Sequence, residues 1–492
     1  MNGGLLKSAS AVAMLAAAGL FANANAADFG GDCCADLEER VAELEATTVR
    51  KGNRKVSLRI SGHIGHQIMW WDDGSQSDTY IGDGGNIFSR FRFTGDAKIT
   101  PQITAGFTYE FGVNQNAIGS MNQLNGGDDL GGASAPLLRD TTVWLRHKQL
   151  GMVKIGHGST ATDNLILIDL GQKSSAATPD AALYNGGFLL RSGNGLLANN
   201  TNANWGAAIR GHESFDTTRR NHVLYETPTL VGFTLQAAVA EDNYWDVALR
   251  YAGEFGGFRL AAGIGYQEDT EFNAPSQDGT GTLGVLCRDK STTTPADNAG
   301  AYGTTNVVSN GNCDVKSSDI KGSASILHVP TGLFVTGAGG IRKLDGENSP
   351  GNALTSYDGP DLGWWYVSGG ISQNFFGVGK TVLFGEYLES KGGLEQAAFL
   401  GNTTNTSVTG GVTNSTGYVS NTLATGSSSS TVNMWGVGIT QHIDAAAMEL
   451  FATYKNFSLD ASGFTGTNAS LNNGANGVAD FQTVIVGTRI NF

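Results

Sequence analysis

The stretch that decides the fold is FQTVIVGTRINF, residues 481–492. Alternate positions counted back from its end are apolar apart from one threonine: Phe492, Ile490, Thr488, Val486 and Val484. The positions between them are mostly polar or small: Asn491, Arg489, Gly487 and Ile485. A period of two is typical of a β-strand with one apolar and one polar face. The stretch therefore predicts a two-faced strand.

The same period recurs along the chain. It is clear in VSLRISGHIGHQIMWW (56–71), SRFRFTGDAKI (89–99) and ITAGFTYEFGV (103–113). We find about sixteen such segments of about ten residues, the length that a tilted strand needs to cross a bilayer. They begin near Val56, Ile87, Ile103, Asp140, Met152, Arg220, Phe233, Tyr244, Phe258, Ile320, Leu333, Trp364, Thr381, Val432, Ala447 and Phe481. The segment near Asp140 fits least well, because Val143, Trp144 and Leu145 do not alternate.

The connections alternate in length. Seven are very short: TPQ, KQLG, TPTLVG, GEFGG, VPTG, FFGVG and IDAA. Longer ones lie between them, around 159–218, 268–317 and 391–430. This alternation predicts an all-β, 16-stranded antiparallel up-and-down transmembrane barrel with one short-turn rim. A soluble β-sandwich is the alternative, but it does not require such strict alternation.

The composition fits a barrel with a polar interior. Hydrophobic residues make up 40% and charged residues 15% of the 492 residues, with 70 glycines against 9 prolines. Such a chain has little apolar material for a conventional core, yet too few charges for disorder. Aromatic residues near strand ends are expected to form a girdle at the membrane interface: Trp70, Trp71, Trp364, Trp365 and Tyr387.

The N-terminal residues predict export. Lys7 precedes an apolar run from Ala9 to Ala22, and Ala24-Asn25-Ala26 fits a cleavage site after Ala26. We therefore expect a signal peptide at 1–26, a short periplasmic segment with a possible helix at 27–54, and the barrel at 55–492. Removing Lys7 takes the formal net charge from −14 to −15, which makes nucleic acid an improbable partner. With an even strand count, both barrel ends are expected at the short-turn rim, on the periplasmic side.

Two features near the start of the mature chain each allow two interpretations. Leu37, Val41 and Leu44 have helical spacing, so residues 36–48 form either a short coiled coil within an oligomer or a solvated helix or linker. The adjacent Cys33 and Cys34 either pair between subunits or stay free.

A disulfide between Cys287 and Cys313 is expected, because both fall in one Gly/Asn/Thr-rich stretch of an exported chain.

With these segments in view, the chain resembles the general porins of Gram-negative outer membranes, in particular the alphaproteobacterial porin family. The resemblance is carried by CADLEERVAELEATTVRKGNRKVSL (34–58), RRNHVLYETPTLVGF (219–233), DNYWDVALRYAGEFGGFRLAAGIGY (242–266), FGVGKTVLFGEY (376–387) and the terminal Phe492. It implies a homotrimer in the outer-membrane lipid, a third extracellular loop folded into the lumen, and passive diffusion of ions and small hydrophilic solutes. The candidate for that loop is the segment Ser159 to Thr218.

Charged residues across the narrowest part of such a pore would set which ions pass. The expected wall residues are Arg59, Arg90, Arg92, His157, Arg220 and Arg250, and the expected loop residues are Asp163, Asp169 and Asp180. Each interior arginine has an alternative role in structural salt bridges. Porins that this chain resembles usually carry Arg where His157 stands, and a histidine there would change its charge near neutral pH.

Other functions find less support. A substrate-selective channel for sugar or phosphate is the first alternative, and a barrel-anchored adhesin or enzyme, using the loop at 391–430, is the second. GVGKT at 377–381 lacks the first glycine of a phosphate loop, because Asn374 stands there. His63 and His66 fall on opposite faces of one strand and cannot share a metal. We expect no catalytic activity, cofactor or metal site.

Overall fold

The structure, a computed structural model, describes residues 56–86, 88–113, 116–126, 136–198, 203–211, 213–241, 243–270, 313–348, 357–400, 428–463 and 477–492. The expected signal peptide, the segment 27–54, the possible coiled coil at 36–48 and Cys33, Cys34 and Cys287 lie outside these residues. The cleavage site and the Cys287–Cys313 disulfide therefore stay predictions.

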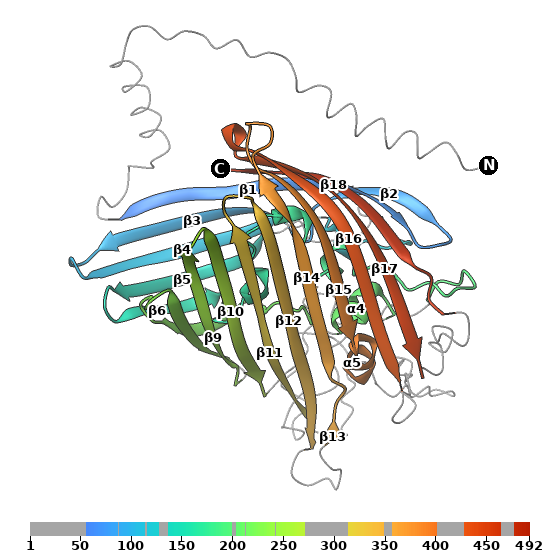
Figure 1. The fold of residues 1–492 in the computed structure, drawn as a ribbon. Helices are drawn as coiled ribbons and strands as arrows, with labels where there is room; N and C mark the ends of the chain where they lie inside the picture. The colour runs from blue at the N-terminus through green and yellow to red at the C-terminus, as the bar shows by residue number, and fades with distance from the viewer. Residues whose placement is uncertain are drawn as a thin grey trace. The chain divides into compact units, whose positions relative to one another are not determined.

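The described residues form one antiparallel sheet that closes into a barrel (Figure 1). Within them, sixteen long strands make the wall, and each pairs with its neighbours in chain order. These strands are β1 (Ser57–Asp72), β3 (Ser89–Lys98), β4 (Ile103–Val113), β5 (Leu137–His147), β6 (Gly151–Gly158), β7 (Arg220–Glu226), β8 (Phe233–Ala240), β9 (Trp245–Phe255), β10 (Phe258–Asp269), β11 (Cys313–His328), β12 (Leu333–Asn348), β14 (Leu362–Gln373), β15 (Thr381–Lys391), β16 (Ser429–Ile443), β17 (Met448–Ser462) and β18 (Phe481–Asn491). The short strands β2 (Ser77–Gly82) and β13 (Tyr357–Asp358) extend this sheet beside β1 and β12. The predicted 16-stranded barrel is confirmed.

The last strand closes the barrel against the first. β18 runs antiparallel to β1, with Ile490 opposite Ile64 and Val486 opposite Ile68. Beyond the strand, Phe492 donates its backbone N–H to the carbonyl of Gly62 and accepts one from the Gly62 N–H, at 3.0 and 2.9 Å. The two-faced strand predicted at residues 481–492 is therefore the seam of the barrel.

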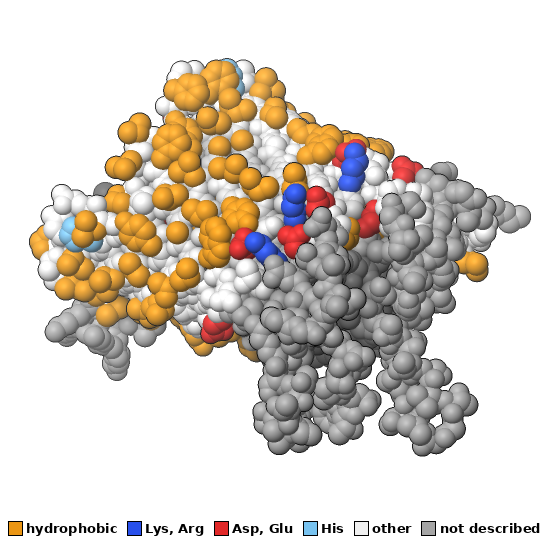
Figure 2. Space-filling model, turned by 90° about the horizontal axis from the view of Figure 1, so that it is seen from below, with side chains coloured by type: hydrophobic (Ala, Val, Ile, Leu, Met, Phe, Trp, Pro, Cys, Tyr) orange, Lys and Arg blue, Asp and Glu red, His pale blue; other side chains and the backbone are white. Residues whose placement is uncertain are grey.

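Each strand has an outward apolar face and an inward face. On β1, Ile64 and Ile68 are 49% and 47% exposed, whereas Gln67 between them is 3% exposed. Apolar side chains stay exposed on the outer face because lipid, not water, surrounds a transmembrane barrel. Figure 2 shows one side of the molecule, where hydrophobic side chains spread over a wide area and charged ones lie at its margin.

Short connections gather at one rim of the barrel. β9 and β10 are joined by residues 256–257 and β11 and β12 by residues 329–332. The seven short connections all join the strand ends at the rim where β1 begins and β18 ends (Figure 1). Among the described residues, no helix has the length and apolar character required to cross a membrane.

The third long connection, residues 159–218, is called the inserted segment below. It contains the short helices η2 (Leu165–Leu167), η3 (Ser174–Ala176), α3 (Ala182–Asn185) and α4 (Trp205–Arg210), and η1 (Ile118–Ser120) and α5 (Gly393–Leu400) lie in other long connections. α4 contacts both α5 and the inner side of β16. Elements between strands therefore occupy part of the space that the wall encloses.

The interior contains an apolar core, which differs from the expected polar interior. Apolar side chains of the inserted segment, such as Phe188 and Trp205, are buried against Phe457 and Phe481 on the wall. Trp71 and Trp364, expected in the interfacial girdle, also point inward and are 2% and 6% exposed. The ring of Trp364 stacks on Phe215 of the inserted segment, with centroids 4.3 Å apart. The girdle interpretation was wrong for these two residues, because the inserted segment gives inward aromatic rings an apolar partner.

Candidate functional site

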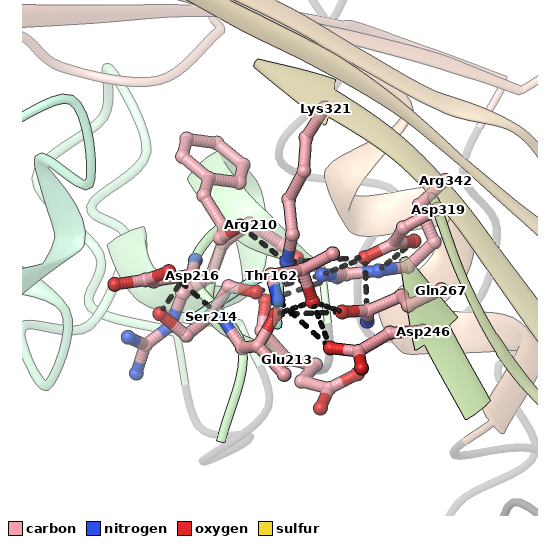
Figure 3. Close-up of polar contacts among 12 residues, drawn as sticks. Thr162, Arg210, Glu213, Ser214, Asp216, Asp246, Gln267, Asp319, Lys321 and Arg342 are labelled. Carbon is pink, nitrogen blue, oxygen red and sulfur yellow. Dashed lines mark hydrogen bonds and ion pairs between the residues drawn. The ribbon is translucent and has the colours of Figure 1, made fainter. Parts of the chain in front are cut away.

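The first end of the inserted segment is fixed to β9 and β10. The backbone N–H of Thr162 donates to the Asp246 carboxylate at 2.8 Å, and its hydroxyl donates to the same carboxylate at 2.8 Å (Figure 3). The hydroxyl of Thr217, from the other end of the segment, donates to Gln267 Oε1 at 2.6 Å. These buried polar groups satisfy one another, so both ends of the segment meet at one place on the wall.

Arg342 on β12 holds the second end. Its guanidinium pairs with Asp319 on β11 at 3.0 Å and donates to the carbonyls of Arg210, Glu213 and Ser214 at 2.7 to 3.2 Å (Figure 3). A planar guanidinium offers five donors in a fixed geometry, which lets one side chain hold several carbonyls. The backbone that follows α4 is thereby fixed to the wall.

The middle of the segment crosses the interior to the opposite wall. Ser323 on β11 donates to the carbonyl of Leu165 at 2.6 Å. Further along, Ser175 donates to Glu449 on β17 at 2.8 Å, and Thr440 on β16 donates to the carbonyl of Lys173 at 3.1 Å. Since the segment bonds to strands on different sides of the barrel, it narrows the space left inside.

A cluster of arginines surrounds one buried carboxylate on β3, β4 and β5. Glu110 accepts from Arg92 Nε at 2.6 Å and from Arg139 Nε at 2.8 Å, and Arg90 lies 3.6 Å away. The Glu110 side chain is 2% exposed, whereas that of Arg92 is 47% exposed. We call Arg90, Arg92, Arg139 and Glu110 the wall cluster. The carboxylate holds the guanidiniums in place, and Arg92 is the most exposed of them.

The sequence predicts Arg90 and Arg92 at this site but does not point to Glu110 and Arg139. Glu110 is the single acid between Tyr109 and Phe111, and strict alternation would have placed it inward. Arg139 is harder to find, because a register shift between Glu110 and Phe111 breaks the alternation of β5.

The inserted segment faces the wall cluster with Asp163. Arg219, which directly follows the segment, lies 3.8 Å from the Asp163 carboxylate, and both interact electrostatically with Arg139. Arg250 on β9 donates to the carbonyls of Asp163 and Ala161 at 2.8 and 3.0 Å. Arg250 therefore contacts the segment's backbone and fixes where Asp163 stands.

The other two acids of the segment lie away from the wall cluster. Asp169 accepts from Lys173 Nζ at 2.6 Å and lies beside Thr336 on β12. Asp180 is buried, 3.4 Å from Arg210, and accepts from the Ser214 hydroxyl at 2.7 Å. Both carboxylates have partners within the segment, so the structure does not bring them to Arg90 and Arg92 as expected.

Arg59 and Arg220 point inward, as expected. Arg59 is exposed on the inward face of β1, and Arg220 pairs with Asp269 at 2.8 Å and lies over the ring of Tyr244. His157 does not share this placement. It falls on the face of β6 that carries the exposed Val153 and Ile155, opposite Thr141 on β5. The structure corrects the expectation that His157 faces the pore, because the alternation of β6 turns it outward.

Asp216 is a further titratable group of the inserted segment. It accepts from the backbone N–H of Asn164 at 2.9 Å and from that of Thr217 at 3.0 Å. Burial, together with repulsion from the Asp163 carboxylate, raises the pKa of Asp216 to about 7. Its charge therefore changes near neutral pH.

The family model for the Gram-negative porin matches residues 9–304, more than half of the 492 residues. The chain belongs to the Gram-negative porins. It is an outer-membrane porin channel, and the family and location that the sequence predicted are confirmed. Within the described residues of this porin, no group of three or more His, Cys, Asp or Glu is arranged to hold a metal ion.

Several solved structures are similar to this porin at low identity. An anion-selective porin from Comamonas acidovorans is 17% identical, with a TM-score of 0.50 over 89% of this chain and 100% of that one. A loop-deletion mutant of the Vibrio cholerae outer membrane protein OmpT is 13% identical, with a TM-score of 0.47 over 89% and 100%. OmpF of Salmonella typhi, solved with daunomycin, is 13% identical, with a TM-score of 0.45 over 89% and 98%. No curated protein matches the chain.

Proposed function

We propose that ions and small hydrophilic solutes pass through this porin between the wall cluster and the start of the inserted segment. Arg90, Arg92 and Arg139 would bound the passage on the wall, and Asp163 and Arg219 on the opposite side. Charged groups across a narrow aqueous passage select among ions by their field. Arg59 and Arg220 would extend the cationic wall, and Arg250 would position the segment.

One observation supports a preference for anions. Side chains of the cations are exposed by 47% for Arg92 and 24% for Arg219, whereas those of the acids, Glu110 and Asp163, are exposed by 2% and 4%. A passing ion therefore meets guanidinium groups, with the carboxylates behind them. We infer that the local potential favours anions although the whole chain is acidic.

The test is the reversal potential of single channels in a salt gradient. Arg92→Gln removes the most exposed charge of the wall cluster while Arg139 still pairs with Glu110, so anion preference should fall. The control is Arg259→Gln, because Arg259 pairs with Glu254 at the short-turn rim, away from the wall cluster. Equal reversal potentials in the Arg92→Gln variant and the unchanged channel would show that the wall cluster does not line the passage.

We also propose that the porin is a homotrimer that associates through the outer face of β1, β3 and β4. On this face, His66 Nδ1 of β1 lies 3.0 Å from the carboxylate of Asp83, which follows β2, and the histidine side chain is 63% exposed. A charged group facing lipid is costly, whereas a subunit interface tolerates it. Phe91 and Phe492 pack together on the same face. Replacing His66 with Glu, which would face Asp83, should yield monomers in chemical cross-linking, and an unchanged trimer would contradict this interface.

We infer that the chain has no catalytic activity. In support, the buried carboxylates of Asp246 and Asp319 are bound to the inserted segment and to Arg342, and that of Glu110 is bound within the wall cluster. A hydrolase assay on the folded porin should give no activity above that of an empty detergent control.

A further inference from the structure

The outer wall of the porin contains a groove that the channel does not use. It has a volume of about 950 Å³ and lies across β11, β12, β14 and β15. Its sides are the outward residues Ile326, Leu333, Val335 and Leu383, and Gly369 and Gly385 form its floor. Leu333 and Val335 are 56% and 52% exposed. The groove is therefore open on the outer face of the barrel.

The floor exists because two glycines face each other across strands. Gly369 on β14 is opposite Gly385 on β15. A Cβ on Gly385 would meet no atom nearer than 3.8 Å, and one on Gly369 none nearer than 3.4 Å. In contrast, a Cβ on the neighbouring Gly370 would overlap the carbonyl oxygen of Leu383. Close packing therefore does not require glycine at 369 and 385, and the missing side chains leave the groove open.

The groove reaches from the short-turn rim into one leaflet. His328 and Leu333 flank the short turn 329–332, while Gly385 lies four residues into β15 from Thr381. Four strand residues span about 13 Å, less than half of the bilayer core of about 30 Å once the strand tilt is included. The groove is thus confined to the periplasmic leaflet, which consists of glycerophospholipid in Gram-negative outer membranes.

A basic group stands where a lipid headgroup would lie. The His328 ring is on the outward face of β11 and packs against Phe258, with centroids 4.6 Å apart. Its Nδ1 is 2.8 Å from the Thr331 hydroxyl, so Nε2 is the ring nitrogen left to meet a phosphate. An imidazole N–H donates a hydrogen bond to a phosphate oxygen. The groove volume is in the range of sites that hold small organic ligands.

We propose that this groove binds one glycerophospholipid of the periplasmic leaflet. An acyl chain lies over Gly369 and Gly385 between Val335 and Leu383, and the phosphate lies beside His328. Moving an acyl chain from the bilayer into the groove changes its hydrophobic free energy little, because both surroundings are apolar. Close van der Waals contact with the groove and the contact between the phosphate and His328 would therefore hold the lipid.

The test is native mass spectrometry of the folded full-length mature porin in detergent with added phosphatidylglycerol. The Gly385→Leu variant fills the groove, and Gly363→Leu is the matched control, since a Cβ there meets nothing within 4 Å and Gly363 lies outside the groove. Phosphatidylglycerol retention should fall about tenfold in Gly385→Leu and stay unchanged in Gly363→Leu. His328→Gln should weaken retention without filling the groove.

Single-channel conductance identifies variants that fail to fold and separates this proposal from the function of the pore. All three variants should conduct like the unchanged porin, because the groove is on the outer face. Equal lipid retention in the conducting Gly385→Leu variant would overturn the site. Displacement of phosphatidylglycerol by lipid A would overturn the assignment of the ligand.

Discussion

At the scale of single residues, exposure decides what each charge does. Glu110 and Asp163 are buried behind arginines, so their main effect is to hold guanidinium groups in position. Asp169 and Asp180 are held by Lys173 and Arg210 and fix the inserted segment. Acids of the same type therefore have different expected effects on ion flow.

The pKa of Asp216 predicts a pH-dependent selectivity. This carboxyl is neutral below and negative above its pKa of about 7, raised by burial and then by Asp163. The anion preference should therefore decrease as pH rises from 5 to 9, with its midpoint near 7. Reversal potentials across this range measure the change. Asp216→Asn should remove it, and His157→Gln should not, because His157 faces outward.

Replacing the two loop acids singly should separate their roles. Asp163→Asn removes a negative charge beside Arg219 and Arg139, so the anion preference should increase. The pH at which Asp216 changes the selectivity should also fall, because the charge that repels its carboxylate is gone. Asp169→Asn should leave selectivity unchanged. Its effect should be a lower unfolding temperature, because the ammonium of Lys173, 2% exposed, loses its partner. A selectivity change in Asp169→Asn would contradict this assignment.

At the scale of elements, the inserted segment depends on side chains of the wall. Arg342 binds three carbonyls at its end, and Thr162 is bound by Asp246 at its start. Strand pairing does not involve these groups, so the barrel can keep its sheet while the segment loosens. These polar contacts therefore position the two ends of the segment, beside its apolar packing on the wall.

Arg342→Lys tests this dependence. A lysine keeps the charge beside Asp319, but its ammonium group cannot donate to three carbonyls in the planar geometry of a guanidinium. About 1–3 kcal/mol of the free energy that holds the inserted segment on the wall should therefore be lost. The open-channel current should become noisier, with more frequent closures, while the heat-modifiable migration of the barrel on gels is retained. Arg259→Lys is the matched control at the short-turn rim. Quiet currents in Arg342→Lys would show that other contacts hold the segment.

At the scale of the whole molecule, closure depends on the seam between β18 and β1. Ten residue pairs run from His63–Asn491 to Asp72–Gln482, and Phe492 adds two backbone hydrogen bonds to Gly62. The Phe492 ring also packs against Phe91, with centroids 5.5 Å apart. The end of the chain thus completes the wall.

Deleting Phe492 should weaken the seam. Two hydrogen bonds are worth about 1–3 kcal/mol together, so the temperature at which the barrel loses its compact migration on gels should fall. Phe492→Ala keeps both backbone bonds and should lower it less. If both variants unfold at the temperature of the unchanged porin, the terminal residue does not contribute to closure.

The sequence by itself determined the strands, their order and the outward face. Alternation in segments such as 56–71 and 481–492 follows from lipid on one side of the wall, and short turns follow from neighbouring antiparallel strands. These are local rules, so they can be recognised without knowing what lies across the barrel. Arg90 and Arg92 were found in the same way, whereas Asp163 was expected from the loop that the resemblance to porins implies.

Only the tertiary structure decided what the inward residues meet. Trp71 and Trp364 are inward because the inserted segment packs on them, and Glu110 gathers arginines from β3 and β5. The reason is physical: a strand pattern reports the solvent on each face, whereas partners inside a barrel come from residues far apart in the chain.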